Sequence, residues 1–338
     1  MRKFIKILVL FYFMVLVTKA SNITKVGTTS ASFLEIGAGA KAIGMGSAFV
    51  AIANDASALY WNVAGIARIE KNQLIFSYNK WFADIKYNYF GGIFPAGNMG
   101  TFGAFITYLS TDDMAVRTIE YPEGTGEKFN ATDFAMGLSY AINLTDRFSI
   151  GFTTKYVSEK IWHMKSHAIA FDIGTLFQTQ FKTLKIGMSI TNFGNKMQMS
   201  GKDAAITYDI DPNKYGNNDR IMGHLDSDKF QMPLNFRLGI SFDVFDAQVG
   251  KMTMGIDALH PNNNSEYMAI GTEYSYNDFL FLRAGYNSLF LKNSEEGPSV
   301  GFGINYQLYP GIKFILDYAW TKYNDLGNIN RISMILAF

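Results

Sequence analysis

The feature that most constrains this chain is an alternation of large apolar residues with small or polar ones, which begins near residue 72 and continues to residue 338. Between residues 312 and 320, every even position is large and apolar, whereas Lys313, Asp317 and Ala319 stand at odd positions. Successive side chains of a β-strand point to opposite faces, so this pattern predicts strands with one apolar face. The same alternation recurs in residues 134–140, 148–156, 184–191 and 300–308.

The composition of the second face indicates which kind of β-protein this is. A soluble sandwich with one wet face would also alternate. Here the face opposite the apolar one is rich in Gly, Ser and Asp, which suits the crowded polar interior of a membrane barrel. The candidate strands, at about 9–15 residues, exceed the mean of about 5–6 in soluble sheets and reach the roughly 9–11 that a tilted membrane strand needs.

Fourteen candidate strands can be counted, an even number as bacterial outer-membrane barrels require. They are residues 72–80, 85–95, 99–110, 131–142, 146–160, 166–179, 182–193, 232–244, 250–259, 265–276, 279–288, 297–308, 311–321 and 329–338. Tight turns alternate with longer links, of which 111–130 and 194–231 are the longest. Short periplasmic turns and long extracellular loops are typical of such barrels, and place both ends of the barrel segment in the periplasm. Trp81, Trp162 and Trp320 then fall at the outer strand ends, where aromatic girdles lie.

The first 20 residues predict export. Arg2, Lys3 and Lys6 precede an apolar run from Ile7 to Val17, and small residues precede a cleavage point after Ala20. The chain has no cysteine, which excludes disulfides and thiol chemistry. The formal net charge is only +1, and all four basic residues of the first 20 would leave with the signal peptide, so nucleic-acid binding has no electrostatic basis.

Residues 21–71 do not alternate and predict a plug inside the barrel, because so short a segment does not easily form a domain of its own. Residues 47–53 are expected to form a short apolar helix, and Asn54-Asp55 to cap a second helix through Tyr60. Gly37-x-Gly39-x-x-Ala42 matches a dinucleotide fingerprint only superficially, because no βαβ unit surrounds it. No cofactor is therefore expected.

Charged residues at inward positions form the candidate lumen. A lysine or arginine facing lipid near the midplane costs roughly 2–4 kcal/mol, so the alternation is expected to point charges inward. These residues are Asp133, Lys155, Asp172, Lys185, Asp257, Arg283, Lys313 and Asp317. Both signs are present. A salt-bridge network that joins plug and wall is the favoured interpretation, and a permeation path is the alternative.

Other residues that carry chemistry do not form a catalytic or metal site. His163, His167, His224 and His260 are expected in or beside solvated loops, with no evident catalytic serine and orienting partner. At the C-terminus, the last predicted strand alternates up to Phe338. A final strand that ends in Phe resembles the signal read by the barrel assembly machinery.

The run from Gly37 to Ala67, GAGAKAIGMGSAFVAIANDASALYWNVAGIA, resembles the N-terminal region of PorV/PorQ-family outer-membrane proteins, relatives of the FadL fatty-acid transporters. The family pattern ends in Asn-Pro-Ala-Gly; this chain has Asn62-Val63-Ala64-Gly65, preceded by Asp55. The resemblance implies a fourteen-stranded barrel with an N-terminal plug. For PorV-type members it implies a role in type IX secretion, and for FadL-type members the passage of hydrophobic molecules through a lateral opening.

The sequence therefore predicts an all-β protein of the bacterial outer membrane: a signal peptide (1–20), a plug segment with short helices (21–71) and a fourteen-stranded antiparallel transmembrane β-barrel (72–338). A non-catalytic role in handling exported cargo is the first functional hypothesis. Uptake of long-chain fatty acids or other hydrophobic molecules is the alternative, and a general porin is a third. The expected partners are outer-membrane lipid, the barrel assembly machinery, and secretion-system subunits or cargo, or else a hydrophobic small molecule.

Overall fold

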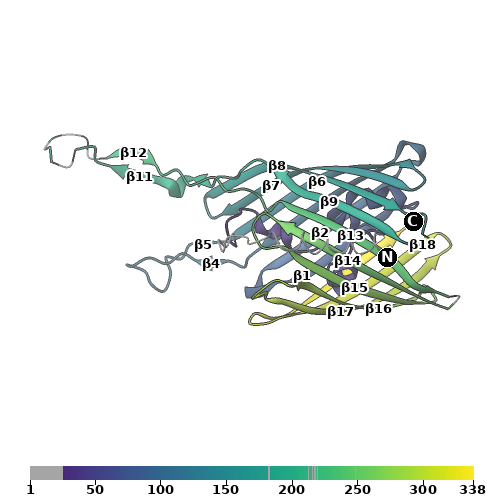
Figure 1. Cartoon of the computed structure of the whole chain (residues 1–338). Helices are drawn as coiled ribbons and strands as arrows, with labels where there is room; N and C mark the ends of the chain where they lie inside the picture. The colour runs from purple at the N-terminus through teal and green to yellow at the C-terminus, as the bar shows by residue number, and fades with distance from the viewer. Residues whose placement is uncertain are drawn as a thin grey trace, which may run out of the picture.

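The computed structural model describes residues 26–181, 183–211, 213–214, 216, 218, 220–247 and 249–338, so the predicted signal peptide lies outside the described residues. Fourteen long antiparallel strands form a closed barrel, as predicted (Figure 1). They are β1 (Gln73–Lys80), β2 (Lys86–Pro95), β3 (Thr101–Ser110), β6 (Ala131–Thr145), β7 (Phe148–Ile161), β8 (Met164–Gln178), β9 (Lys185–Gly194), β13 (Asn235–Asp246), β14 (Gly250–Pro261), β15 (Tyr267–Tyr276), β16 (Leu280–Leu289), β17 (Glu296–Tyr309), β18 (Ile312–Tyr323) and β19 (Gly327–Ala337).

Pairing between the first and last strands closes the barrel. β1 pairs with β19 in a register that places Gln73 opposite Ala337, and Phe338 continues it by donating its backbone N–H to Asn72 O at 3.0 Å. Every other pairing between two long strands joins strands that are consecutive among the long strands of the chain. Several strands run a few residues past their predicted ends; β8, for example, begins at Met164. At these strand ends, the backbone hydrogen bonds between paired strands continue beyond the residues that alternate between apolar and polar side chains.

The two faces of the wall explain the alternation. Phe76 and Tyr78 of β1 are exposed on the outside, whereas Ile75, Ser77 and Asn79 between them are buried on the inside. Large apolar side chains cover the outer surface in the same way on the other strands. So much exposed apolar surface is stable in contact with lipid rather than with water. None of the helices in the described ranges combines the length and apolar character needed to span a membrane.

The two ends of the barrel differ. One end carries short turns, such as the turn η4 (Gly97–Met99), together with the start of β1 and the end of β19. The other end carries the long links. By the usual asymmetry of these barrels, the short-turn end faces the periplasm.

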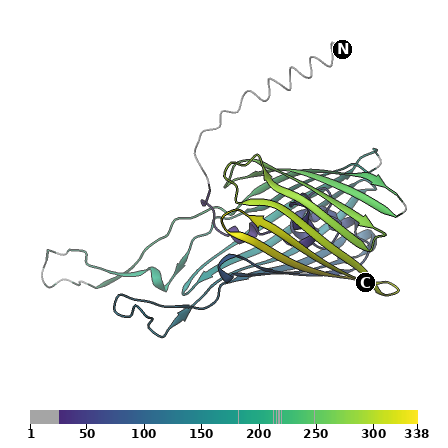
Figure 2. The ribbon, with the colours of Figure 1, turned by 90° about the horizontal axis from the view of Figure 1, so that it is seen from below.

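Two of the long links project from the barrel as arms (Figures 1 and 2). The first arm, residues 111–130, contains the paired strands β4 (Met114–Ala115) and β5 (Lys128–Phe129). The second arm, residues 195–234, contains β10 (Ser200–Gly201), the turn η5 (Lys202–Ala204), and the hairpin of β11 (Ala205–Tyr208) and β12 (Ile221–His224). The outer links at 81–85, with η3 (Phe82–Asp84), and at 162–163 are short.

Residues 26–71 are here called the inner segment, and apart from the exposed residues 26–28 and 70–71 they lie inside the barrel (Figures 1 and 2). They contain η1 (Ser32–Glu35), α2 (Ala40–Gly44), α3 (Ala58–Trp61) and η2 (Val63–Arg68). Most of their apolar side chains are fully buried.

The predicted helix at residues 47–53 is wrong, because the structure has only turns there. Ser47 and Ala53 have positive φ angles of 65° and 30°, which no right-handed helix accommodates. The predicted second helix is present as α3, but it begins at Ala58, and its N-cap is Ser57 rather than Asn54 or Asp55. The Asp55 side chain accepts the backbone N–H of Ser57 in the turn that precedes this helix. Contacts with the barrel wall override the local helix preference of this stretch.

Candidate functional site

Glycines on the inner face of the wall allow the inner segment to pack closely against it. A Cβ atom at Gly285 would lie 2.6 Å from Met45 O, and one at Gly255 would lie 2.6 Å from Ala48 O. Both positions face backbone atoms of the inner segment, which cannot rotate away from an added Cβ as a side chain can. The small-residue face seen in the sequence therefore brings the inner segment within van der Waals contact of the wall. The wall glycines whose Cβ would meet the inner segment are Gly91, Gly103, Gly151, Gly174, Gly187, Gly239, Gly255, Gly271, Gly285 and Gly301.

Asp257 of β14 fixes the turn that replaces the predicted helix. Its Oδ2 accepts the backbone N–H groups of Phe49 and Val50 at 2.9 and 3.0 Å, and the residue is 1% exposed. A buried carboxylate that accepts backbone N–H groups makes hydrogen bonds stronger than neutral ones. Asp257 was predicted to face the lumen, and its contact is with the inner segment.

The residues of the resemblance motif hold the inner segment together. Asn62 is the N-cap of η2: its Oδ1 accepts the N–H of Ala64 at 3.2 Å, and its Nδ2 donates to Val50 O and Thr175 O. Val63 takes the first position of η2, where proline is favoured because it needs no N–H partner there. The Asn62 side chain therefore caps η2 although Val63 lacks the fixed φ angle of a proline.

The remaining motif residues also act within this segment. Asp55 Oδ1 accepts from the backbone N–H of Ser57 at 2.8 Å and from its hydroxyl at 2.5 Å. Gly65 lies against Ala53, whose Cβ would be 2.7 Å from a Cβ at position 65. These contacts are structural, and none involves a group poised for catalysis.

A buried charge network joins three strands on the inside of the wall. Arg283 donates from Nε to Glu273 and from Nη1 to Asp317, both at 2.6 Å. Lys41 of the inner segment lies 3.6 Å from Asp55 and 3.9 Å from Glu273. The sequence analysis placed Arg283 and Asp317 inside but did not name their partner Glu273, although the alternation of β15 also points Glu273 inward. The alternation does not show which inward charges meet.

The other inward charges are spread through the lumen. Lys155 and Asp172 are buried and form an ion pair at 2.7 Å. Asp133 is half-buried, and Lys185 is half-buried near the periplasmic end. Lys313 is exposed at the start of β18, close to the periplasmic rim. The predicted residues therefore do not gather into a single site.

Cavities remain on both sides of the inner segment. The outer cavity has a volume of about 470 Å³ and is lined by residues from the inner segment and from the outer strand ends, among them Phe33, Trp61, Trp81, Tyr267 and Arg331. Trp81 packs in this outer cavity, with its ring 5.2 Å from the Arg331 guanidinium. The prediction that Trp81 belongs to an outer aromatic girdle is therefore wrong. The periplasmic cavity, about 270 Å³, is lined mainly by polar groups.

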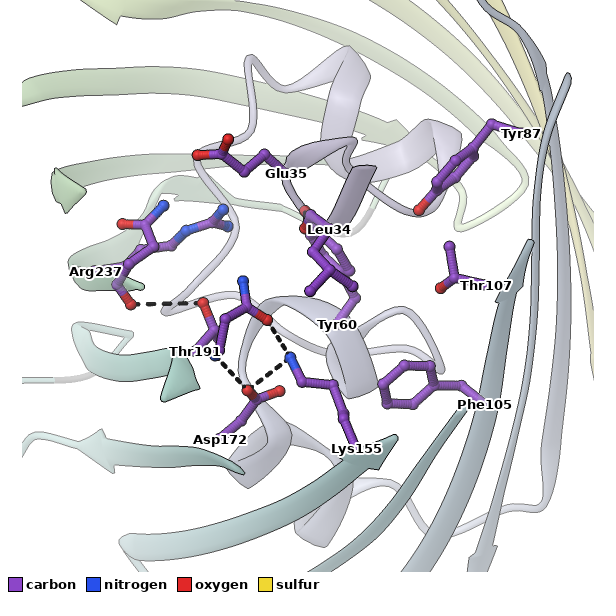
Figure 3. A pocket seen from close by; sticks show the side chains of 12 residues that line it. Leu34, Glu35, Tyr60, Tyr87, Phe105, Thr107, Lys155, Asp172, Thr191 and Arg237 are labelled. Carbon is purple, nitrogen blue, oxygen red and sulfur yellow. Dashed lines mark hydrogen bonds and ion pairs between the residues drawn. The ribbon is translucent and has the colours of Figure 1, made fainter. Parts of the chain in front are cut away.

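A third, nearly closed cavity of about 20 Å³ lies beside the outer one (Figure 3). Leu34, Glu35 and Tyr60 of the inner segment line one side, and the Lys155–Asp172 pair lines the other. Burial raises the pKa of the Glu35 carboxyl, and burial raises the pKa of Tyr60 to about 12. Sequence reasoning missed Arg237, whose guanidinium stacks on Trp61 at 4.8 Å.

The four histidines are all exposed. His163 lies 3.0 Å from Asp203, and His260 lies 3.0 Å from Glu266. Across the described part of the chain, no three histidine or acidic side chains are grouped closely enough to hold a metal ion.

The family model for "Type IX secretion system protein PorV" matches residues 19–260. The chain belongs to this family. The protein is thus an outer-membrane barrel, as the resemblance of residues 37–67 implied. No curated protein matches the chain.

Three solved structures of similar fold are described as channels or transporters. The CymD monoaromatic hydrocarbon channel is 14% identical, with a TM-score of 0.56, covering 89% of this chain and 97% of its own. The Pseudomonas putida toluene transporter TodX is 14% identical, with a TM-score of 0.55 and coverage of 89% and 97%. The Ralstonia pickettii toluene transporter TbuX is 13% identical, with a TM-score of 0.55 and the same coverage. At these identities the likeness concerns the fold alone.

Proposed function

We propose that this protein handles exported proteins at the outer membrane in type IX secretion, and that it does so by binding rather than by catalysis. Membership of the PorV family supports the secretion role. The observation that carries the proposal is the second arm, which extends well beyond the barrel at the long-loop end (Figures 1 and 2).

The arms present apolar side chains to solvent, away from the lipid-facing wall. On the second arm Tyr208 is 58% exposed, Ile210 67% and Met222 69%, and on the first arm Ile119 and Tyr121 are also exposed. Apolar side chains at such positions contribute nothing to the packing of the barrel. Grouped exposed apolar residues commonly form protein contacts, and aromatic and methionine side chains are enriched in such interfaces.

In this proposal the inner segment acts as a plug. Its backbone rests on the wall glycines, and Asp257, Asn62 and Lys41 tie it to the wall or to itself. A lumen filled in this way favours a role at the outer surface over a general porin, which needs an open polar channel.

The second candidate is the uptake of a hydrophobic molecule. It is favoured by the outer cavity, whose volume of about 470 Å³ lies within the range of about 300–1,000 Å³ that small ligands occupy. Several apolar and aromatic side chains line that cavity, but so do Glu35, Glu296 and Arg331. Because buried charges are costly beside an apolar ligand, this lining favours the secretion role.

Native purification from outer membranes in mild detergent, followed by mass spectrometry of proteins and lipids, tests the proposal. The test variant replaces Tyr208, Ile210 and Met222 by serine, and a matched control replaces Lys202, Lys214 and Lys229 of the same arm by serine. Recovery of secretion subunits or exported proteins with the wild type and the control, but not with the test variant, is expected. Equal recovery with all three proteins contradicts the role of the arm, and recovery of apolar molecules without protein partners supports uptake instead.

A further inference from the structure

Three side chains from adjacent strands meet beside the small cavity of Figure 3. Lys155 projects from β7, Asp172 from β8 and Asn192 from β9, and each residue is only 5% exposed. The Lys155 Nζ lies 2.7 Å from Asp172 Oδ1 and donates a short hydrogen bond to Asn192 Oδ1. An amine, a carboxamide and a carboxyl group are therefore in mutual contact.

Asn192 is held in place by its backbone as well as by its side chain. Its φ angle is 65°, in the left-handed region, and the β8–β9 register shifts between Phe171 and Ile173 at this point. Its backbone N–H donates to Asp172 Oδ1 at 2.8 Å, and its Nδ2 donates to Pro233 O at 3.0 Å. The amide carbon therefore has a fixed position relative to the lysine.

We propose that Lys155 and Asn192 are joined by an isopeptide bond that forms within the folded chain, with Asp172 as the proton carrier. The contact between Nζ and Oδ1 suits this step, because the amide C=O bond is only about 1.23 Å long. For the reaction, the nitrogen must move from the amide oxygen to the adjacent Cγ, where reacting atoms are roughly 3–3.5 Å apart before attack.

The three groups lie where little water can reach them. The adjacent cavity, about 20 Å³, has room for little more than one water molecule. Phe105, Tyr87 and Leu34 contribute apolar surface to its lining. In the proposed reaction, the first step is the passage of the shared proton from the lysine ammonium to the aspartate across their 2.7 Å contact.

The reaction balances without a co-reactant. The neutral Nζ of Lys155 attacks Cγ of Asn192 and forms a C–N bond, while the protonated Asp172 hydrogen-bonds to the developing oxyanion. A proton then passes from Nζ through the Asp172 carboxyl to Nδ2. The bond between Cγ and Nδ2 breaks and ammonia leaves. The departing ammonia takes the proton that Asp172 first received from Lys155, so Asp172 returns to the carboxylate. A primary amine and a primary amide have become a secondary amide and ammonia, with no change of oxidation state.

The location gives the bond a structural consequence. Asn192 is near the end of β9, where the chain leaves the wall to form the second arm, and Pro233 is where it returns. A covalent link from β7 to β9 across β8 would fasten the base of that arm to the barrel. The chain has no cysteine, so a disulfide cannot supply such a link.

Mass spectrometry of the intact protein purified from outer membranes tests the proposal on the wild type alone. The expected mass is lower than that of the processed sequence by one ammonia molecule, and a protease digest should contain a branched peptide joining Lys155 to Asn192. Recovery of the Lys155 and Asn192 peptides as separate, unmodified species overturns the proposal and leaves a simple buried ion pair.

Two variants separate the chemistry from accidental ammonia loss. Lys155→Arg keeps the positive charge but has no primary amine, and Asp172→Ala keeps both reacting groups but has no proton carrier; both should show the full mass. The control Lys313→Arg, at the exposed rim, should retain the branched peptide. If Asp172→Ala forms the bond as completely as the wild type, the assigned role of Asp172 is wrong.

Discussion

Replacement of Gly285 by alanine measures how tightly the inner segment sits on the wall. The new Cβ would lie 2.6 Å from Met45 O and closer still to Gly46 N. Carbon atoms in good contact are about 3.5–4.0 Å apart, so one backbone must retreat by about 1 Å. Overpacking of this kind costs roughly 1–3 kcal/mol, and the upper part of that range is expected because both obstructing groups are backbone.

Equilibrium unfolding in urea with the protein in detergent micelles gives this free energy. Limited proteolysis of the folded variant reports separately whether the inner segment has detached from the barrel wall. The control is Gly223→Ala in the second arm, where the nearest atom to a new Cβ, Ile206 Cγ1, is at an ordinary 3.5 Å. That control should change stability by less than about 0.5 kcal/mol. If Gly285→Ala matches the wild type in both assays, the close contact between Gly285 and the inner segment is not made in solution.

Four further predictions concern single side chains. Asp257→Asn should lower stability by roughly 1.5–3 kcal/mol, measured by the same unfolding assay, because two backbone N–H groups lose a charged acceptor; wild-type stability would refute its anchoring role. Arg283→Met should cost about 3–5 kcal/mol, since two buried carboxylates lose their partner; a loss no larger than that of the exposed control Lys313→Met would contradict it. Burial raises the pKa of the Glu35 carboxyl, so the folded chain binds the carboxyl proton more tightly than the unfolded chain, and the stability contributed by Glu35 falls as pH rises above 4.5. The free energy of unfolding of Glu35→Gln in urea, relative to that of the wild type, should therefore grow with pH. A difference that stays constant with pH would exclude this titration. Deletion of Phe338 should reduce the amount of barrel assembled in outer membranes, measured by membrane fractionation, while refolding in detergent is retained; unchanged assembly would remove Phe338 from the proposed signal.

The membrane strands were predictable because one physical constraint repeats along the whole barrel. Every residue of a spanning strand faces either lipid or lumen, and the side-chain period of two reveals which. The alternation therefore located all fourteen long strands and placed Asp257, Arg283 and Asp317 on the inner face. Hairpin ladders continue past the apolar region, so the strand ends were less well defined.

The N-terminal segment shows where local reasoning stops. Residues 47–53 have the apolar composition of a short helix, but the N–H groups of Phe49 and Val50 bond to Asp257, more than 200 positions later in the chain. Trp81 likewise stands at a strand end, yet its ring packs over Arg331 inside the outer cavity. In both cases a partner from a distant strand decides the conformation.

The sequence by itself determined the class of fold, the membrane-facing surface and the family, because these depend on period, strand length and one contiguous motif. Only the tertiary structure decided which inward groups meet. Lys155 and Asp172 could be placed on the lumen side from their parity alone, but their contact with Asn192 depends on the shifted β8–β9 register and on a left-handed backbone angle. Barrel closure and strand register set such contacts, and neither leaves a local pattern in the sequence.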